Sequence, residues 1–77
     1  MKYIDVRTPE EFATGHHPEA INHPVEQIIA GVMPDIAQGE AICVYCRSGA
    51  RAGVARDLML RAGFTNVVNG GGVADVC

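Results

Sequence analysis

Residues 41–51 have the sequence AICVYCRSGAR, and this stretch decides the fold. Residues 41–45 are a continuous run of apolar, β-forming side chains, which is typical of a strand covered on both faces. Residues 46–51 form a loop after that strand, and Val54 and Leu58 then begin a helical apolar spacing. A strand, a short loop and a helix in this order are typical of parallel α/β sheets. We therefore expect residues 41–45 at the centre of a sheet.

The segment at the start of the chain repeats this order of elements. Residues 3–6 alternate apolar and polar side chains as a strand does, and Thr8 can cap the helix that follows. Pro9 suits the first helical position, and Glu11 can complete a capping box with Thr8. The sequence therefore predicts a strand followed by a short helix that stops at Gly15.

The middle of the chain predicts a second strand and a second helix. Residues 20–22 are a short apolar piece, and Pro24 can open the helix. Pro34 and Gly39 then bracket a loop. The residues expected to give this helix one buried face are Ile28, Ile29, Val32 and Met33.

The C-terminal part predicts the end of the long helix and a last strand. Gly63 fits a left-handed cap, and residues 66–69 have a strand pattern. Residues 70–72 are all glycine, from which we expect a tight turn into a helical turn at residues 73–75. The chain as a whole predicts an α/β fold, a small parallel β-sheet flanked by helices, in a single domain over residues 1–77.

Charge and cysteine content exclude several classes of function. A net charge of −3 argues against nucleic acid as a partner, because neutralising phosphates requires a basic face. No apolar run approaches the ~20 residues that span a bilayer, so no membrane partner is expected. Three cysteines argue against a closed disulfide framework. We expect a monomer, with Cys77 exposed and available for intermolecular disulfides. The compartment stays open: we expect the cytoplasm for the chain as given, and the periplasm if an export signal has been removed.

The loop after the central strand carries the most specific chemical signal. Backbone N–H groups and the dipole of a helix start favour an anion, and the thiolate of Cys46 is such an anion. With Arg47 and Arg51 as cationic neighbours, cysteines in this setting have pKa values lowered from about 8.5 towards roughly 4–7. Gly49 allows the backbone to turn inward. The competing interpretation is an ordinary buried cysteine, but the combined pattern favours a nucleophile.

The order of these motifs resembles that of the rhodanese family along nearly the whole chain. The matching segments are residues 4–7 (IDVR), 10–12 (EEF), 15–16 (GH), 20–22 (AIN), 46–51 (CRSGAR) and 71–72 (GG). The short chain resembles the small exported phage-shock rhodaneses more than the longer cytosolic enzymes of the family.

The resemblance implies a sulfurtransferase that carries sulfur as a persulfide on Cys46. In that cycle Cys46 attacks the sulfane sulfur of thiosulfate, sulfite leaves, and the persulfide passes its sulfur to cyanide or a thiol. No metal and no organic cofactor is implied. The residues implied in substrate binding are Arg47, Ser48, Gly49, Ala50 and Arg51. The two arginines are suited to the sulfonate oxygens, and which one faces the substrate stays open.

Partners and alternatives follow from the same loop. The implied partners are a small-molecule sulfur donor, a thiol or cyanide acceptor, and thioredoxin-like or persulfide donor proteins. The related phosphatases place five residues between Cys and Arg, whereas four stand between Cys46 and Arg51, and the phosphatase arginine would fall on Ala52. This argues against phosphatase or arsenate reductase activity. A persulfide carrier and a non-catalytic binding module of the same fold remain as alternatives.

Other residues that could carry chemistry have a simpler interpretation. Cys43 and Cys46 have the spacing of a redox pair, but three residue steps of a strand cover roughly 10 Å. A disulfide needs Cα atoms within about 7 Å, so Cys43 is expected in the core. The histidines lie in a turn-rich segment without a recognised ligand spacing, and no metal site is predicted for His16, His17 and His23.

Asp5 and Arg7 end the first strand on the side of the sheet where the Cys46 loop is expected. Two interpretations stay open for them. They either support that loop through an ion pair, or they form an ordinary surface pair worth at most ~1 kcal/mol.

Overall fold

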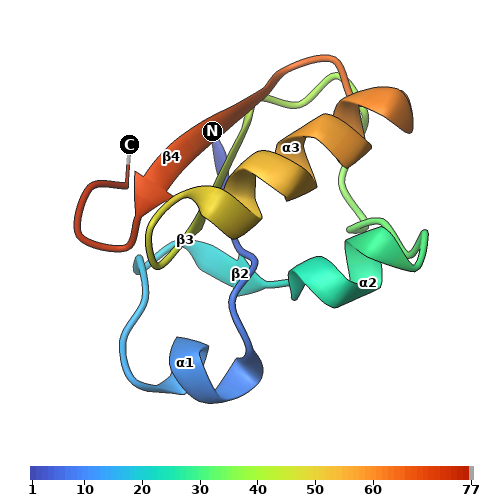
Figure 1. Ribbon diagram of the computed structural model, residues 1–77. Helices are drawn as coiled ribbons and strands as arrows, with labels where there is room; N and C mark the ends of the chain where they lie inside the picture. The colour runs from blue at the N-terminus through green and yellow to red at the C-terminus, as the bar shows by residue number, and fades with distance from the viewer. Residues whose placement is uncertain (77) are drawn as a thin grey trace.

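The computed structural model describes residues 1–76, and its centre is a parallel sheet of four strands (Figure 1). The strands are β1 (Lys2–Asp5), β2 (Ala20–Asn22), β3 (Ile42–Cys46) and β4 (Val67–Gly72). Their order across the sheet is β2-β1-β3-β4, and all neighbouring pairs are parallel. The predicted α/β fold is confirmed. Cys77, expected to be exposed, lies outside the described residues.

The two middle strands, β1 and β3, carry the core. Every residue of β3 is buried, as expected for a strand covered on both faces. Because successive side chains of a strand point to opposite faces, Val44 and Cys46 share one face while Cys43 and Tyr45 share the other. The first face belongs to the main hydrophobic cluster. This cluster consists of Ile4, Val6, Val25, Ile28, Ile42, Val44, Cys46, Ala52, Ala55, Met59, Phe64 and Val67.

Three helices connect the strands: α1 (Pro9–Ala13), α2 (Val25–Ile29) and α3 (Ala50–Arg61). α3 packs against β3, β4 and α2, and in Figure 1 α3 passes in front of the sheet while α2 lies below it at the right. α1 lies below the loop that enters α3 in the same view. Within residues 1–76, no helix has the length and apolar character needed to cross a membrane.

α1 forms as its first residues predict. The Thr8 side chain accepts a hydrogen bond from the Glu11 N–H at 3.2 Å, and the Glu11 carboxylate accepts one from the Thr8 N–H at 3.2 Å. This reciprocal pair is a capping box, with Pro9 at the start of the helix. The helix buries none of its own residues.

The predicted buried face of the second helix is wrong in part. Ile28 is buried and Met33 packs against the hydrophobic cluster, but Ile29 is 62 % exposed and Val32 54 %. The helix ends at Ile29, and Gly31 follows with a φ of +89°, so the helical spacing does not continue to Val32.

The long helix α3 ends before a left-handed Gly63, as predicted, and Leu58 packs against the hydrophobic cluster, but the rest of its buried face differs from the expected spacing. Ala52, Ala55 and Met59 are buried, whereas Val54 and Leu60 are exposed. Small residues on the inner face allow the helix to approach the sheet closely.

The last strand is longer than predicted, because the glycines at 70–72 belong to β4 rather than to a turn. The β3–β4 register shifts between Val44, which pairs with Asn69, and Cys46, which pairs with Gly72. A Cβ atom on Gly72 would collide with the carbonyl oxygen of Arg47. The end of β4 therefore approaches the loop after Cys46 at a distance that only glycine permits.

Candidate active site

Cys46 lies at the carboxyl end of the sheet, where loops leave the strands of a parallel α/β fold. The residue is 1 % exposed, and it lies beside Val44 in the hydrophobic cluster. Its Sγ accepts a hydrogen bond from the Gly49 N–H at 2.9 Å. Within residues 1–76, Cys46 is a free cysteine, so it forms no disulfide with Cys43. Cys43 is buried, as expected.

The pKa of the Cys46 thiol is lower than its ordinary value of 9.0, and two opposing causes set it. Burial is the largest cause and raises the pKa, because a thiolate is poorly solvated in the core. The contributions of four backbone N–H groups outweigh this effect together, and the Gly49 N–H among them makes the hydrogen bond to Sγ given above. They belong to Ala52, Ser48, Gly49 and Arg51. The local backbone therefore favours the thiolate, which is the nucleophilic form.

Gly49 allows these N–H groups to converge. It is the N-terminal cap of α3, with a φ of +94°, a left-handed conformation that other residues rarely adopt. The chain reverses there, and the first turn of α3 begins with its unpaired N–H groups near the Cys46 sulfur. The predicted inward turn at Gly49 is confirmed.

Arg51 is held by α1. Its Nη1 donates to Glu11 Oε1 at 2.7 Å, and its Nη2 donates to Glu11 Oε2 at 3.0 Å. Two parallel hydrogen bonds between a guanidinium and a carboxylate fix the plane of both groups. The Glu11 hydrogen bonds raise the pKa of Arg51, and the electrostatic attraction of Cys46 adds to this. Arg51 is therefore a fixed positive charge close to the sulfur.

The Glu11 carboxylate predicts a pH dependence of stability. The hydrogen bonds from Arg51 and from the Thr8 backbone lower the pKa of Glu11 from 4.5 to about 2. Because the folded pKa lies below the unfolded one, the stabilisation is complete above pH 4.5 and is lost as the pH falls towards 2. The variant Glu11→Gln can keep the capping box, because its amide oxygen still accepts the Thr8 N–H. Between pH 4.5 and 2, we expect its free energy of unfolding, measured by denaturant titration, to depend less on pH than that of the wild type.

The control for this experiment is Glu10→Gln, which removes a charge from the same turn and leaves the Arg51 bridge in place. Its stability should depend on pH as that of the wild type does. A Glu11→Gln profile as steep as the wild-type one between pH 4.5 and 2 would contradict the assignment.

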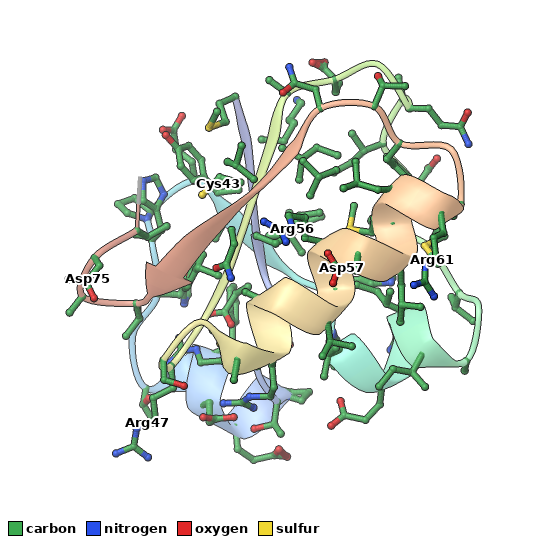
Figure 2. All side chains as sticks on the ribbon, turned by 45° about the horizontal axis from the view of Figure 1, so that its top comes forward. Cys43, Arg47, Arg56, Asp57, Arg61 and Asp75 are labelled. Carbon is green, nitrogen blue, oxygen red and sulfur yellow. The ribbon has the colours of Figure 1, made fainter. Side chains whose placement is uncertain are left out.

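The remaining predicted loop residues lie at the surface. Arg47, Ser48 and Ala50 are exposed, and Figure 2 shows the Arg47 side chain extending away from the body of the protein. Among the described residues, Arg47 has no hydrogen-bond or ion-pair partner. Of the two arginines in the loop, the structure therefore leaves Arg47 available for a ligand and engages Arg51 with Glu11.

Asp5 and Arg7 form a buried ion pair, so the interpretation as a surface pair is wrong. Their side chains are 0 % and 6 % exposed, and Arg7 Nη2 lies 2.6 Å from Asp5 Oδ2. Arg7 Nη2 also donates to the Gly15 carbonyl at 2.7 Å, and the guanidinium lies 5.9 Å from the Tyr45 ring centroid. The Tyr45 hydroxyl in turn accepts the His17 N–H. The pair thus supports the α1–β2 connection on the face of the sheet opposite to Cys46.

The family follows from comparison of the chain with known proteins. Residues 1–74 match the family of rhodanese-like domains. The chain belongs to the rhodanese family. The family predicted from the order of the motifs is therefore confirmed. Two relatives of this rhodanese are named as thiosulfate sulfurtransferases.

Two curated relatives show how far the similarity extends. The thiosulfate sulfurtransferase PspE of Escherichia coli is 36 % identical, over 96 % of this chain and 72 % of PspE. The chloroplastic thiosulfate sulfurtransferase 16 of Arabidopsis thaliana is 43 % identical, over 86 % of this chain and 64 % of the relative. This rhodanese therefore spans about two thirds of the length of the Arabidopsis protein.

Solved structures support the same fold. The structure of an E. coli rhodanese with anions has a TM-score of 0.83 and 35 % identity, and the match covers 99 % of this chain and 91 % of the other. The human single-domain sulfurtransferase TSTD1 has a TM-score of 0.82 and 26 % identity, with 94 % and 75 % covered. The predicted rhodanese fold is thus confirmed.

The sequence did not predict the contacts that two residues, Glu11 and Asn69, make with the loop after Cys46. Glu11 was recognised for its capping box, and its second role as partner of Arg51 carries no local signal. Asn69 bonds to the Gly49 carbonyl, and its only sequence signal is an amide side chain directly before glycines, a pattern that favours local turns.

A cavity of about 400 Å³ lies elsewhere, at the edge of the sheet around the start of β1 and the loop before β3. It is lined by Lys2, Ile21, Asp35, Ile36, Ala37 and Glu40. None of these residues belongs to the loop around Cys46. We place the site at Cys46 because backbone N–H groups lower the pKa of its thiol, and the Gly49 N–H donates to its sulfur.

Proposed function

We propose that this rhodanese is a thiosulfate sulfurtransferase in which Cys46 carries the sulfur as a persulfide. The observation that supports this most strongly is the buried Cys46 sulfur below four converging backbone N–H groups. Such a site stabilises a thiolate and also the terminal sulfur anion of a persulfide. The family and the named activity of its relatives agree with this chemistry.

The proposed cycle has two displacement steps. The Cys46 thiolate attacks the outer sulfur of thiosulfate, the sulfur–sulfur bond of thiosulfate breaks, and sulfite leaves with the bonding electrons. A thiophilic acceptor such as cyanide then attacks the terminal sulfur of the Cys46 persulfide. Thiocyanate leaves and the thiolate is restored, so that neither step needs a proton, an oxidant or a cofactor.

The loop residues divide the work of binding the donor. Arg47 is the exposed cation, and we assign to it the contact with the sulfonate oxygens of thiosulfate. Arg51, engaged with Glu11, adds fixed positive charge. The N–H groups of Ser48, Gly49 and Arg51, together with that of Ala50 at the start of α3, are suited to hold the transferred sulfur.

The small loop also supports sulfur transfer over phosphoryl transfer. Only four residues separate Cys46 from Arg51, and the side chain of Arg51 is engaged with Glu11 instead of facing a free cradle. A phosphoryl group needs donors around several oxygens, and a guanidinium fork usually supplies two of them. Ala52, which takes the place of the phosphatase arginine, cannot do so.

Incubation with thiosulfate, followed by intact mass measurement, tests the proposed function. We expect the protein to gain the mass of one sulfur atom, and cyanide to remove it with release of thiocyanate. Aryl phosphates should not be hydrolysed.

Three other outcomes of this experiment distinguish the alternatives. An adduct that forms only with a persulfide donor protein, and not with thiosulfate, would indicate a sulfur carrier. The absence of an adduct from both donors would indicate a binding module. Turnover of aryl phosphates that depends on Cys46 would contradict the argument from loop length.

A further inference from the structure

Asn69 joins the end of β4 to the loop that carries Cys46. Its Nδ2 donates to the Gly49 carbonyl at 3.0 Å, and its Oδ1 accepts the Gly71 N–H at 2.9 Å. The two bonds need the same orientation of the amide, since the nitrogen can only donate and the oxygen can only accept. One side chain thus fixes Gly49 relative to the strand that lies beside it.

Gly49 is also the residue whose N–H donates to the Cys46 sulfur at 2.9 Å. Its carbonyl accepts from Asn69 and from the Gly53 N–H at 2.9 Å, the first bond of α3. Gly49, with a φ of +94°, has no side chain to limit its rotation and none to cap α3. The orientation of the Gly49 N–H therefore depends on the backbone angles of Gly49, and the hydrogen bond from Asn69 to the Gly49 carbonyl restrains these angles.

The packing around Gly49 agrees with this role. A Cβ atom on Gly49 would lie 3.4 Å from Gly71 Cα and 3.7 Å from Asn69 Oδ1, so the loop and the end of β4 are in contact. The close approach of Gly72 to the Arg47 carbonyl holds the other side of the same loop. The end of β4 is therefore a rigid support against which Asn69 can hold Gly49.

We infer that Asn69 is a positioning residue for the Cys46 thiolate, acting through the Gly49 N–H. This inference rests on the proposed function in one respect, that Cys46 is the working nucleophile. Asn69 holds the Gly49–Ala50 peptide, and the Gly49 N–H belongs to the adjoining Ser48–Gly49 peptide. Loss of the Asn69 amide loosens the φ and ψ angles of Gly49, which set the angle between these two peptides, and so weakens the hydrogen bond to the sulfur. The thiolate then loses part of its stabilisation, and Cys46 becomes nucleophilic only at higher pH.

The test is the rate of Cys46 alkylation by iodoacetamide as a function of pH, with the labelled site mapped by peptide mass. We expect Asn69→Ala to raise the midpoint of this profile by about half to one pH unit, the size of one net hydrogen bond. The matched control is Asn66→Ala, which removes an exposed amide three positions earlier, and its midpoint should equal that of the wild type. Equal midpoints for Asn69→Ala and the wild type would overturn the inference.

A second variant separates positioning from folding. Asn69→Asp keeps an acceptor for the Gly71 N–H but has no donor for the Gly49 carbonyl, so it preserves this hydrogen bond within β4 if Asn69→Ala does not fold. Its new charge would also raise the midpoint, but high salt screens that contribution. A rise that persists at high salt supports the inference, and a rise that salt abolishes contradicts it.

The charged groups that already surround the loop are unchanged in Asn69→Ala and Asn66→Ala. They are Arg47 in the loop, Arg51 on α3, Glu11 on α1 and Asp75 after β4, whose carboxylate lies 3.6 Å from the Cβ position of Gly72. A midpoint shift therefore reports the change at Asn69.

Sulfur transfer from thiosulfate provides an independent readout. Asn69→Ala should lower kcat at neutral pH and leave the KM for thiosulfate nearly unchanged, because Arg47 still binds the sulfonate. If the wild type transfers no sulfur and Asn69→Ala still shifts the alkylation profile, the proposed function fails and the positioning role stands. If sulfur is transferred and the profile does not shift, the positioning role fails.

Discussion

Cys46→Ser should take up no sulfur from thiosulfate and should lose thiosulfate:cyanide turnover by more than about 10³-fold. A serine hydroxyl is not ionised at neutral pH and cannot form a persulfide. The fold should persist, because Cys46 is 1 % exposed and serine is of similar size, with an oxygen that can accept the Gly49 hydrogen bond. Intact mass after incubation, together with a thermal unfolding curve, measures both expectations.

The control for this variant is Cys77→Ser, which keeps Cys46 and should gain one sulfur atom as the wild type does. A sulfur adduct on folded Cys46→Ser would show that another cysteine carries the sulfur. That result would contradict both the proposed function and the role given to the loop.

Asp5→Ala should lower the free energy of unfolding by about 3–5 kcal/mol, the range measured when one partner of a buried ion pair is removed. The Arg7 side chain is 6 % exposed and would keep its charge without the carboxylate that accepts its hydrogen bonds. Small domains have total stabilities near about 5 kcal/mol, so the variant should be largely unfolded at elevated temperature. Urea titration followed by circular dichroism measures the loss.

The surface pair of Arg56 and Asp57 provides the matched control. Its side chains are 42 % and 59 % exposed, and Asp57→Ala should change stability by less than about 1 kcal/mol. Figure 2 shows both of these residues on α3. The double variant Asp5→Ala with Arg7→Leu should recover part of the loss, because no unpaired charge remains. A loss below about 1 kcal/mol in Asp5→Ala would contradict the importance of the buried pair.

Features that depend on neighbouring residues were predictable from the sequence. The capping box of Thr8 and Glu11, with Pro9 between them, spans four positions and forms as expected. The apolar run of residues 41–45 predicted a fully buried strand, and Gly49 predicted the turn towards Cys46. In each case the residues that make the signal are also those that make the structure.

Features that depend on tertiary contacts were not predictable in the same way. Arg51 and Glu11 are far apart in the chain, and only the completed fold brings α1 beside the start of α3. The exposure of Ile29 and Val32 follows from the early end of α2, which their spacing does not reveal. The burial of Asp5 depends on the α1–β2 connection that covers it.

The glycines at the end of β4 show why the predicted turn at residues 70–72 was wrong. A run of glycines usually marks a turn, because glycine adopts conformations that strands do not need. Here Gly72 continues the strand, since the Arg47 carbonyl leaves no space for a side chain. A requirement for space at one contact therefore outweighs the local preference of the residue.

The burial of all five residues of β3 also implies that parts of the site differ in the free energy of local opening. Local opening of a protein starts where few apolar contacts are lost, and a central buried strand opens only with global unfolding. Cys46 ends such a strand, whereas Glu11 lies in a five-residue helix that buries none of its own residues. Separating Glu11 from Arg51 should therefore cost less free energy than displacing Cys46, so the electrostatic environment of the loop can change while the nucleophile stays in place.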